Sequence, residues 1–155
     1  IYMWLLEIVK ALKKAGVEFA VAGGYAVSLH GAVRGTIDLD FVISLNEKNM
    51  HKLQDCLVSL GYRSKLPVTA DEIHKFRKEY IEKRNLIAWS FYEASNPAHI
   101  IDIIITEDLR KLTSQNMSAY GEKIPVLSLK SLIQMKRRSN RPQDKEDVKA
   151  LEMLE

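Results

Sequence analysis

The sequence has few of the features that mark several common protein classes. It contains a single cysteine, Cys56, in 155 residues, which excludes a disulfide framework and a metal cluster built from several thiolates. No apolar run approaches the roughly 18 residues of a membrane span, and no signal peptide is visible. Internal repeats and low-complexity tracts are also lacking. We therefore expect a cytoplasmic protein that has no membrane partner.

The composition is that of an ordinary globular protein. Hydrophobic residues make up 46% of the chain and charged residues 28%, which is enough apolar material for a packed core. A length of 155 residues favours one domain, or one domain with a helical appendage. The net charge of +3 permits a nucleotide or RNA partner without requiring one.

Hydrophobic periodicity and turn residues predict the order of the elements. The helices are expected over 1–15, 25–30, 46–60, 70–84, from 128 until Arg141-Pro142, and over 143–154. The strands are expected over 17–22, 37–43, 62–63, 86–93 and 99–106, with a turn at 95–97, a helical turn over 108–112, and a hairpin or edge strand over 119–126. This order predicts an α/β (α+β) fold with a mixed central sheet flanked by helices. We divide it into a core, 1–126, and a helical appendage packed on that core, 127–155.

The stretch from Gly23 to Ile43 organises the rest of the chain. Residues 37–43 read IDLDFVI and alternate with period two, so Asp38 and Asp40 are expected on one face of a strand. Their Cα atoms would stand roughly 6.6 Å apart. The isoleucine at 37 is expected on the opposite, apolar face together with Leu39, Phe41 and Ile43. Adjacent carboxylates repel each other, so a cation is their natural partner.

A third acidic residue, Asp102, interrupts the apolar run at 100–105. A carboxylate buried there without a partner would be costly, and the alternative is an Asp that points to solvent from an edge strand. Three acidic residues on two strands that face one cleft suit Mg²⁺, which prefers oxygen ligands and substrate phosphates. A two-metal site is one such arrangement.

Two glycines complete the pattern. Gly23 and Gly24 let the backbone approach a phosphate closely at the start of a helix. Arg34 is a candidate cation beside the β- and γ-phosphates of a bound nucleoside triphosphate. Thr36 is expected at the entry of the strand, where it hydrogen-bonds to nearby groups. Each signal alone is weak, since a Gly-Gly pair is usually only a turn and an Asp-x-Asp pair is often a surface pair.

Order and spacing together are more specific. The pattern HG-x-x-R-x-T-x-D-x-D, from His30 to Asp40, resembles the nucleotidyltransferase superfamily that includes DNA polymerase beta. It is most similar to the small bacterial branch, which holds lincosamide and aminoglycoside nucleotidyltransferases, minimal nucleotidyltransferases and AbiE-type toxins. One departure is that many relatives have Gly-Ser, whereas Gly24 is followed here by Tyr25.

The resemblance implies the nucleotidyltransferase fold and a reaction in which an acceptor attacks the α-phosphate of an NTP and releases pyrophosphate. It assigns Asp38, Asp40 and Asp102 to catalysis and Mg²⁺ binding, and Gly23 and Gly24 to the nucleotide.

The C-terminal segment resembles the K-x(n)-R-x-x-D-x-x-D segment that ends many such proteins, with Lys136, Arg141, Asp144 and Asp147 in its positions. The resemblance implies that Lys136 reaches the nucleotide phosphates and that Arg141 pairs with Asp144 or Asp147. A solvated Lys136 on a helix surface is the alternative.

The acceptor stays open among a small molecule such as an antibiotic, a tRNA or other RNA, and a protein side chain. A tRNA or protein acceptor would suit a toxin–antitoxin module with a partner protein. The competing hypothesis is a non-catalytic module that binds a nucleotide or a partner on the same fold.

Overall fold

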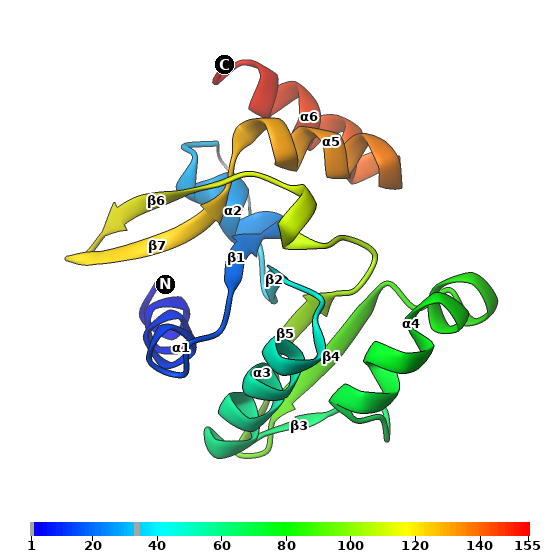
Figure 1. Ribbon diagram of the computed structural model, residues 1–155. Helices are drawn as coiled ribbons and strands as arrows, with labels where there is room; N and C mark the ends of the chain where they lie inside the picture. Colours follow the sequence, from blue (N-terminus) through cyan, green and yellow to red (C-terminus); the bar gives the residue numbers. More distant parts are fainter. Residues whose placement is uncertain (1, 33–34) are drawn as a thin grey trace.

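The computed structural model describes residues 2–32 and 35–155, and it confirms the predicted mixed α/β architecture (Figure 1). The strands are β1 (Phe19–Ala22), β2 (Leu39–Ile43), β3 (Tyr62–Ser64), β4 (Ala88–Glu93), β5 (Asn96–Ile104), β6 (Ser114–Ala119) and β7 (Glu122–Leu127). The helices are α1 (Met3–Lys14), α2 (Gly23–Leu29), α3 (Glu47–Ser59), α4 (Ala70–Arg84), α5 (Leu129–Ser139) and α6 (Pro142–Glu152), with a 3₁₀ turn η1 (Leu109–Lys111). In this described part, the strands form one sheet in the order β3-β4-β5-β2-β1-β7-β6.

Strands with nearly continuous apolar sequences form the centre of the sheet. All four residues of β1 are buried. This strand pairs antiparallel with β2 and parallel with β7, and β2 in turn runs parallel to β5. Helices and loops cover both faces of these strands, so apolar side chains are needed on both. The parallel pairing of β2 with β5 brings their acidic residues together.

Polar caps fix where several helices begin. The Asn46 side chain accepts a hydrogen bond from a backbone N–H three residues later, at the start of α3. Thr69 and Glu72 form a capping box at the start of α4, and Ser128 caps α5. Each cap satisfies a backbone donor that has no partner inside its helix. The starts predicted at Asn46, Ala70 and Ser128 are therefore confirmed, and α3 and α4 lie side by side (Figure 1).

The prediction for Ile37 was wrong. This side chain is 78% exposed, and β2 begins only at Leu39. The reason lies in the register, because the neighbouring strand β1 ends at Ala22, which pairs with Asp40. Residues that precede Asp40 therefore have no partner in β1, because β1 has already ended. Residues 37 and 38 lead into the sheet as an irregular segment.

The turn between β4 and β5 lies one residue earlier than predicted. Ala94 and Ser95 form it, whereas Asn96 and Pro97 already belong to β5. The pairing of β5 with β2 covers only residues 101–104, so the beginning of β5 has β4 alone as a neighbour. Proline is tolerated at such an edge, because its missing N–H does not remove a ladder hydrogen bond.

The hairpin expected over 119–126 is longer, because it includes β6. That strand reads SQNMSA and is mostly exposed, so it carries no apolar alternation that could predict it. The turn between β6 and β7 consists of Tyr120 and Gly121, with φ of 50° and 76°. Two consecutive positive φ values match the type I′ turn that suits a two-residue hairpin loop.

The C-terminal helices α5 and α6 pack against each other at one end of the molecule (Figure 1). Their apolar side chains Leu132, Ile133, Val148 and Leu151 belong to the same hydrophobic cluster as the sheet. The division at residue 126 stays a prediction. Within the described residues, every helix is too short or too polar to cross a membrane.

Candidate active site

The glycine turn and the strand that follows it are packed in direct contact. Gly23 begins α2 immediately after β1 and has a φ of +61°, a backbone angle that residues other than glycine rarely adopt. A Cβ atom at this position would lie 2.0 Å from Oδ2 of Asp40. The Asp40 carboxylate therefore lies against the backbone of the turn, and only glycine allows it to do so.

Gly24 meets the segment before β2 in a similar way. A Cβ atom at this position would lie 2.5 Å from Cβ and 2.7 Å from Oγ1 of Thr36. The Thr36 hydroxyl donates a hydrogen bond of 3.3 Å to the carbonyl oxygen of Asp38. The space that a side chain at position 24 would need is thus occupied by Thr36, which ties together the turn and the segment that leads to Asp38.

This contact predicts the result of a simple substitution. Gly24→Ala should destabilise the protein by about 1–3 kcal/mol, the usual cost of overpacking, because two Cβ atoms cannot stand 2.5 Å apart. Thr36→Gly removes the opposing Cβ, so the double variant should be more stable than the sum of the two single effects. Urea unfolding of the four proteins measures this coupling. If the change in the free energy of unfolding of the double variant equals the sum of the two single changes, the contact is contradicted.

The three predicted acidic residues line one cavity. Asp40 and Asp102 are direct register partners on the parallel strands β2 and β5, and Asp38 lies just before β2. All three line an open cavity of about 1240 Å³. Asp102 also accepts a hydrogen bond of 2.5 Å from the Ser90 hydroxyl, which lies opposite it on β4. Sequence reasoning did not find Ser90, because cross-strand pairing alone brings it there.

The carboxylates act on each other electrostatically. Burial, reinforced by the Asp102 and Asp38 carboxylates, raises the pKa of Asp40 to about 7, although the cations of Lys136 and Arg141 oppose the rise. Burial and the Asp102 carboxylate also raise the pKa of Asp38. The site therefore brings several carboxyl groups together in a partly desolvated cavity. A cation bound there would favour the ionised forms of these carboxyl groups.

Lys136 on α5 and Arg141 at the start of α6 also line the cavity and belong to a charged network with Asp144 and Asp147. The Lys136 ammonium lies 2.8 Å from Oδ2 of Asp147 and 3.7 Å from Oδ1 of Asp144, and its side chain is only 10% exposed. The Arg141 guanidinium donates through Nε to Oδ2 of Asp144 at 3.0 Å. The predicted pairing of Arg141 with Asp144 is thus present at the start of α6, whereas the contacts of Lys136 with Asp144 and Asp147 join α5 to α6.

Other cavity-lining residues were not anticipated from the sequence. Arg138 forms an ion pair with Glu107 and so joins α5 to the segment after β5. The apolar side chains Ile37 and Ile87 are exposed on the cavity lining. The cavity therefore combines acidic, basic and apolar walls, as a site for a large polar substrate would require.

The structure brings most of the predicted site residues to this one cavity. Gly23, Thr36, Asp38, Asp40, Asp102 and Lys136 all line it. Gly24 is not among the lining residues. A Cβ atom at this position would point toward Thr36. Arg34 lies outside the described residues.

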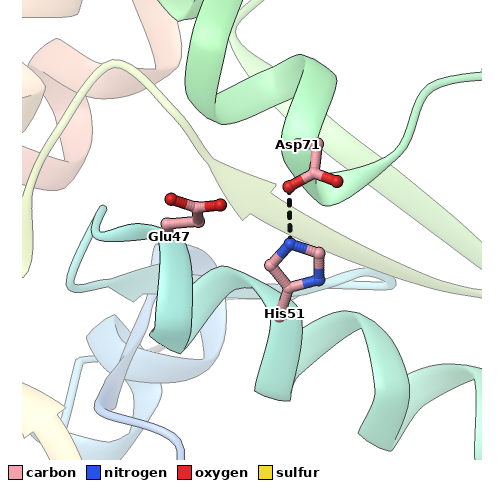
Figure 2. Close-up of side chains that lie close together, drawn as sticks. All are labelled: Glu47, His51 and Asp71. Atoms are coloured by element: carbon pink, nitrogen blue, oxygen red, sulfur yellow. Dashed lines mark hydrogen bonds and ion pairs between the residues drawn. The ribbon is translucent and has the colours of Figure 1, made fainter.

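A second group of possible metal ligands lies where α3 and α4 meet. Glu47 and His51, one turn apart on α3, approach Asp71 in the first turn of α4, with ligand atoms within 4.8 Å of one another (Figure 2). The His51 ring lies 2.6 Å from Oδ1 of Asp71. This pair explains the arrangement without an ion, because it connects two packed helices.

The His51–Asp71 pair predicts a pH dependence of stability. The hydrogen bond to Asp71 raises the pKa of His51 above its usual 6.5. A group with a raised folded-state pKa contributes stability that is complete below the unfolded-state pKa and is lost as pH rises through the folded-state pKa. The difference in melting temperature between the native protein and Asp71→Asn should therefore be larger at pH 5.5 than at pH 8.5. An equal difference at both pH values would contradict the pair.

Comparison with known proteins identifies the family. Residues 4–151 match the family described as aminoglycoside-2''-adenylyltransferase. The chain belongs to this family. A search of curated protein sequences finds no significant match.

Solved structures with low sequence identity share the nucleotidyltransferase fold. ANT(2")-Ia in complex with adenylyl-2"-tobramycin has a TM-score of 0.62 at 12% identity, over 96% of this chain and 85% of that chain. The lincomycin-bound lincosamide adenylyltransferase LnuA has a TM-score of 0.64 at 14% identity, over 97% and 96%. An antigenic nucleotidyltransferase-like protein from Paracoccidioides brasiliensis has a TM-score of 0.58 at 16% identity, over 93% and 71%.

Membership of the aminoglycoside-2''-adenylyltransferase family makes this chain a nucleotidyltransferase, an enzyme that transfers a nucleoside monophosphate. The predicted superfamily and the predicted fold are both confirmed.

Proposed function

We propose that this nucleotidyltransferase moves a nucleoside monophosphate from an NTP to an acceptor hydroxyl in a Mg²⁺-dependent reaction that releases pyrophosphate. The observation that carries the proposal is the grouping of Asp38, Asp40 and Asp102 in one cavity beside the glycine turn. Carboxylates on and beside paired strands, next to a backbone that can approach a phosphate, are what metal-assisted phosphoryl transfer needs.

The three carboxylates fit a divalent cation. They offer only oxygen donors. Burial, reinforced by the two neighbouring carboxylates, raises the pKa of Asp40 to about 7, and a bound positive charge would favour its ionised form. Asp38, Asp40 and Asp102 would hold Mg²⁺, with room for a two-metal arrangement. When bound, Mg²⁺ would stabilise the negative charge that develops on the phosphates during transfer.

The chain's own residues have distinct roles in this proposal. Asp102 accepts the proton of the attacking hydroxyl, and the Ser90 hydroxyl holds this carboxylate in place. Gly23 and Gly24 shape the turn that receives the triphosphate, together with Thr36. The remaining proposed nucleotide ligands are Arg34 and Lys136.

A small molecule is the acceptor that the comparisons favour. Two of the similar structures hold adenylyl-2"-tobramycin and lincomycin, which are small molecules. The open cavity of about 1240 Å³ has room for both a nucleotide and such an acceptor. We therefore propose a polar small molecule rather than RNA or protein, and we expect the enzyme to act in the cytoplasm.

The test is transfer of label from each of the four α-³²P-labelled NTPs, with Mg²⁺, to three classes of acceptor: a panel of aminoglycosides and lincosamides, total tRNA, and the protein itself. Labelled small-molecule product would support the proposal. Label on tRNA or on the protein would replace the proposed acceptor class. Nucleotide binding without transfer to any acceptor would indicate a non-catalytic module.

A further inference from the structure

Arg141 is the most exposed of the three cationic side chains near the C-terminal helices that line the cavity. The Lys136 ammonium lies in a side chain only 10% exposed and is engaged by two carboxylates. Arg138 forms an ion pair with Glu107, and two of its nitrogens donate to that carboxylate. Arg141 lines the same cavity with a side chain that is 68% exposed.

A buried carboxylate fixes the guanidinium of Arg141 from one side. Asp144, whose side chain is 2% exposed, accepts hydrogen bonds from Nε of Arg141 at 3.0 Å, from Nη2 at 3.5 Å and from the backbone N–H at 3.1 Å. The Ser139 hydroxyl donates to the same carboxylate at 2.5 Å. A guanidinium has five N–H groups, so a single carboxylate leaves donors for a second anion.

The position of Arg141 relative to the acidic residues suits a phosphate chain. Arg141 lines the same cavity as Asp38, Asp40 and Asp102. A nucleotide held at the carboxylates carries several negative charges on its β- and γ-phosphates, which need cationic partners. The planar fork of arginine binds two phosphate oxygens at once, which the point charge of lysine cannot do.

We propose that Arg141 is a direct ligand of the nucleotide's phosphate groups and that Asp144 holds its guanidinium in the binding orientation. This inference rests on the proposed function, because it concerns the same nucleotide site. It gives the C-terminal helices a part in substrate binding, since Arg141 is the N-cap residue of α6.

The test uses inorganic tripolyphosphate with Mg²⁺, a probe that does not depend on the base or the acceptor. We expect the full-length protein to bind it in isothermal titration calorimetry and Arg141→Gln to bind it about tenfold more weakly, as the loss of a charged hydrogen bond requires. The glutamine can still donate to Asp144. Arg137→Gln is the matched control, because Arg137 is exposed on α5, pairs with Glu152 and does not line the cavity. It should change the affinity by less than about twofold.

A second measurement uses only the native protein and so does not depend on whether a variant folds. In the native protein, the side-chain NMR signal of Arg141 should shift when tripolyphosphate and Mg²⁺ are added, while that of Arg137 stays in place. Unchanged affinity in Arg141→Gln, or an unchanged Arg141 signal in a protein that binds tripolyphosphate, would overturn this inference alone. A native protein that binds neither tripolyphosphate nor any NTP would overturn both this inference and the proposed function.

Discussion

Asp40→Asn should stabilise the ligand-free protein at pH 8 and abolish nucleotidyl transfer. Burial and two neighbouring carboxylates raise the pKa of Asp40 to about 7. Above that pH the folded protein must hold a charge that the unfolded chain exposes to water. A shift of this size corresponds to at most ~4 kcal/mol. We expect a gain of about 2 kcal/mol, because the amide must also be desolvated.

The sign of the pH dependence follows from the protons bound. Between the unfolded-state pKa, about 4, and the folded-state pKa, about 7, the folded protein holds a proton on Asp40 that the unfolded chain has lost. The contribution of Asp40 to stability therefore falls as pH rises through this window. The advantage of Asp40→Asn should be large at pH 8 and small at pH 4.5.

Urea unfolding at the two pH values measures the effect of Asp40→Asn. Asp55→Asn serves as the control, because Asp55 is exposed on α3, away from the cavity lining. It should change stability by less than about 0.5 kcal/mol at either pH. A destabilised Asp40→Asn at pH 8, or the same advantage at both pH values, would contradict the electrostatic account of the site.

Lys136→Met should destabilise the protein by about 3 kcal/mol, because removing one partner of a buried ion pair leaves the other charge without compensation. Lys136 lies 2.8 Å from Asp147 and 3.7 Å from Asp144, and both carboxylates are almost completely buried. Adding Asp147→Asn to the variant removes the carboxylate that has lost its nearest cation, so the double variant should recover about half of the lost stability.

The double variant also separates two roles of Lys136. If Lys136 contacts phosphate as well as Asp147, Lys136→Met with Asp147→Asn should regain stability but not NTP affinity. Arg137→Met is the control, because its ion pair with Glu152 is exposed and should contribute less than about 0.5 kcal/mol. Denaturant unfolding and calorimetry with NTP provide the two readouts. Equal stabilities of Lys136→Met and Arg137→Met would show that the network does not support the fold.

The sequence predicted those parts of the site that depend on local pattern. The strand with Asp40, the second strand with Asp102 and the glycine turn were readable because each combines an apolar run with a residue type that is uncommon in such a run. Asp38 was expected in the first of these strands but lies just before it. The pairing of Arg141 with Asp144 was also accessible, since three residues bring both to the start of one helix.

The rest depended on contacts between distant segments. Ser90 reaches Asp102 only through the pairing of β4 with β5, and no property of its own sequence neighbourhood marks it. The exposure of Ile37 follows from the end of β1 at Ala22, which pairs with Asp40. The alternation of residues 37–43 does not reveal where the neighbouring strand ends. The polar edge strand β6 lacks the alternation on which strand prediction relies.

Metal binding tests the central claim most directly, because it needs neither the acceptor nor turnover. Mn²⁺, as a spectroscopic substitute for Mg²⁺, can be titrated by electron paramagnetic resonance in the presence of each of the four α,β-methylene nucleoside triphosphates. We expect the native protein and Asp55→Asn to bind Mn²⁺ with nucleotide, and Asp40→Asn and Asp102→Asn to bind it at least about tenfold more weakly. Equal affinity in the native protein, Asp40→Asn and Asp102→Asn would contradict a catalytic metal site at these carboxylates.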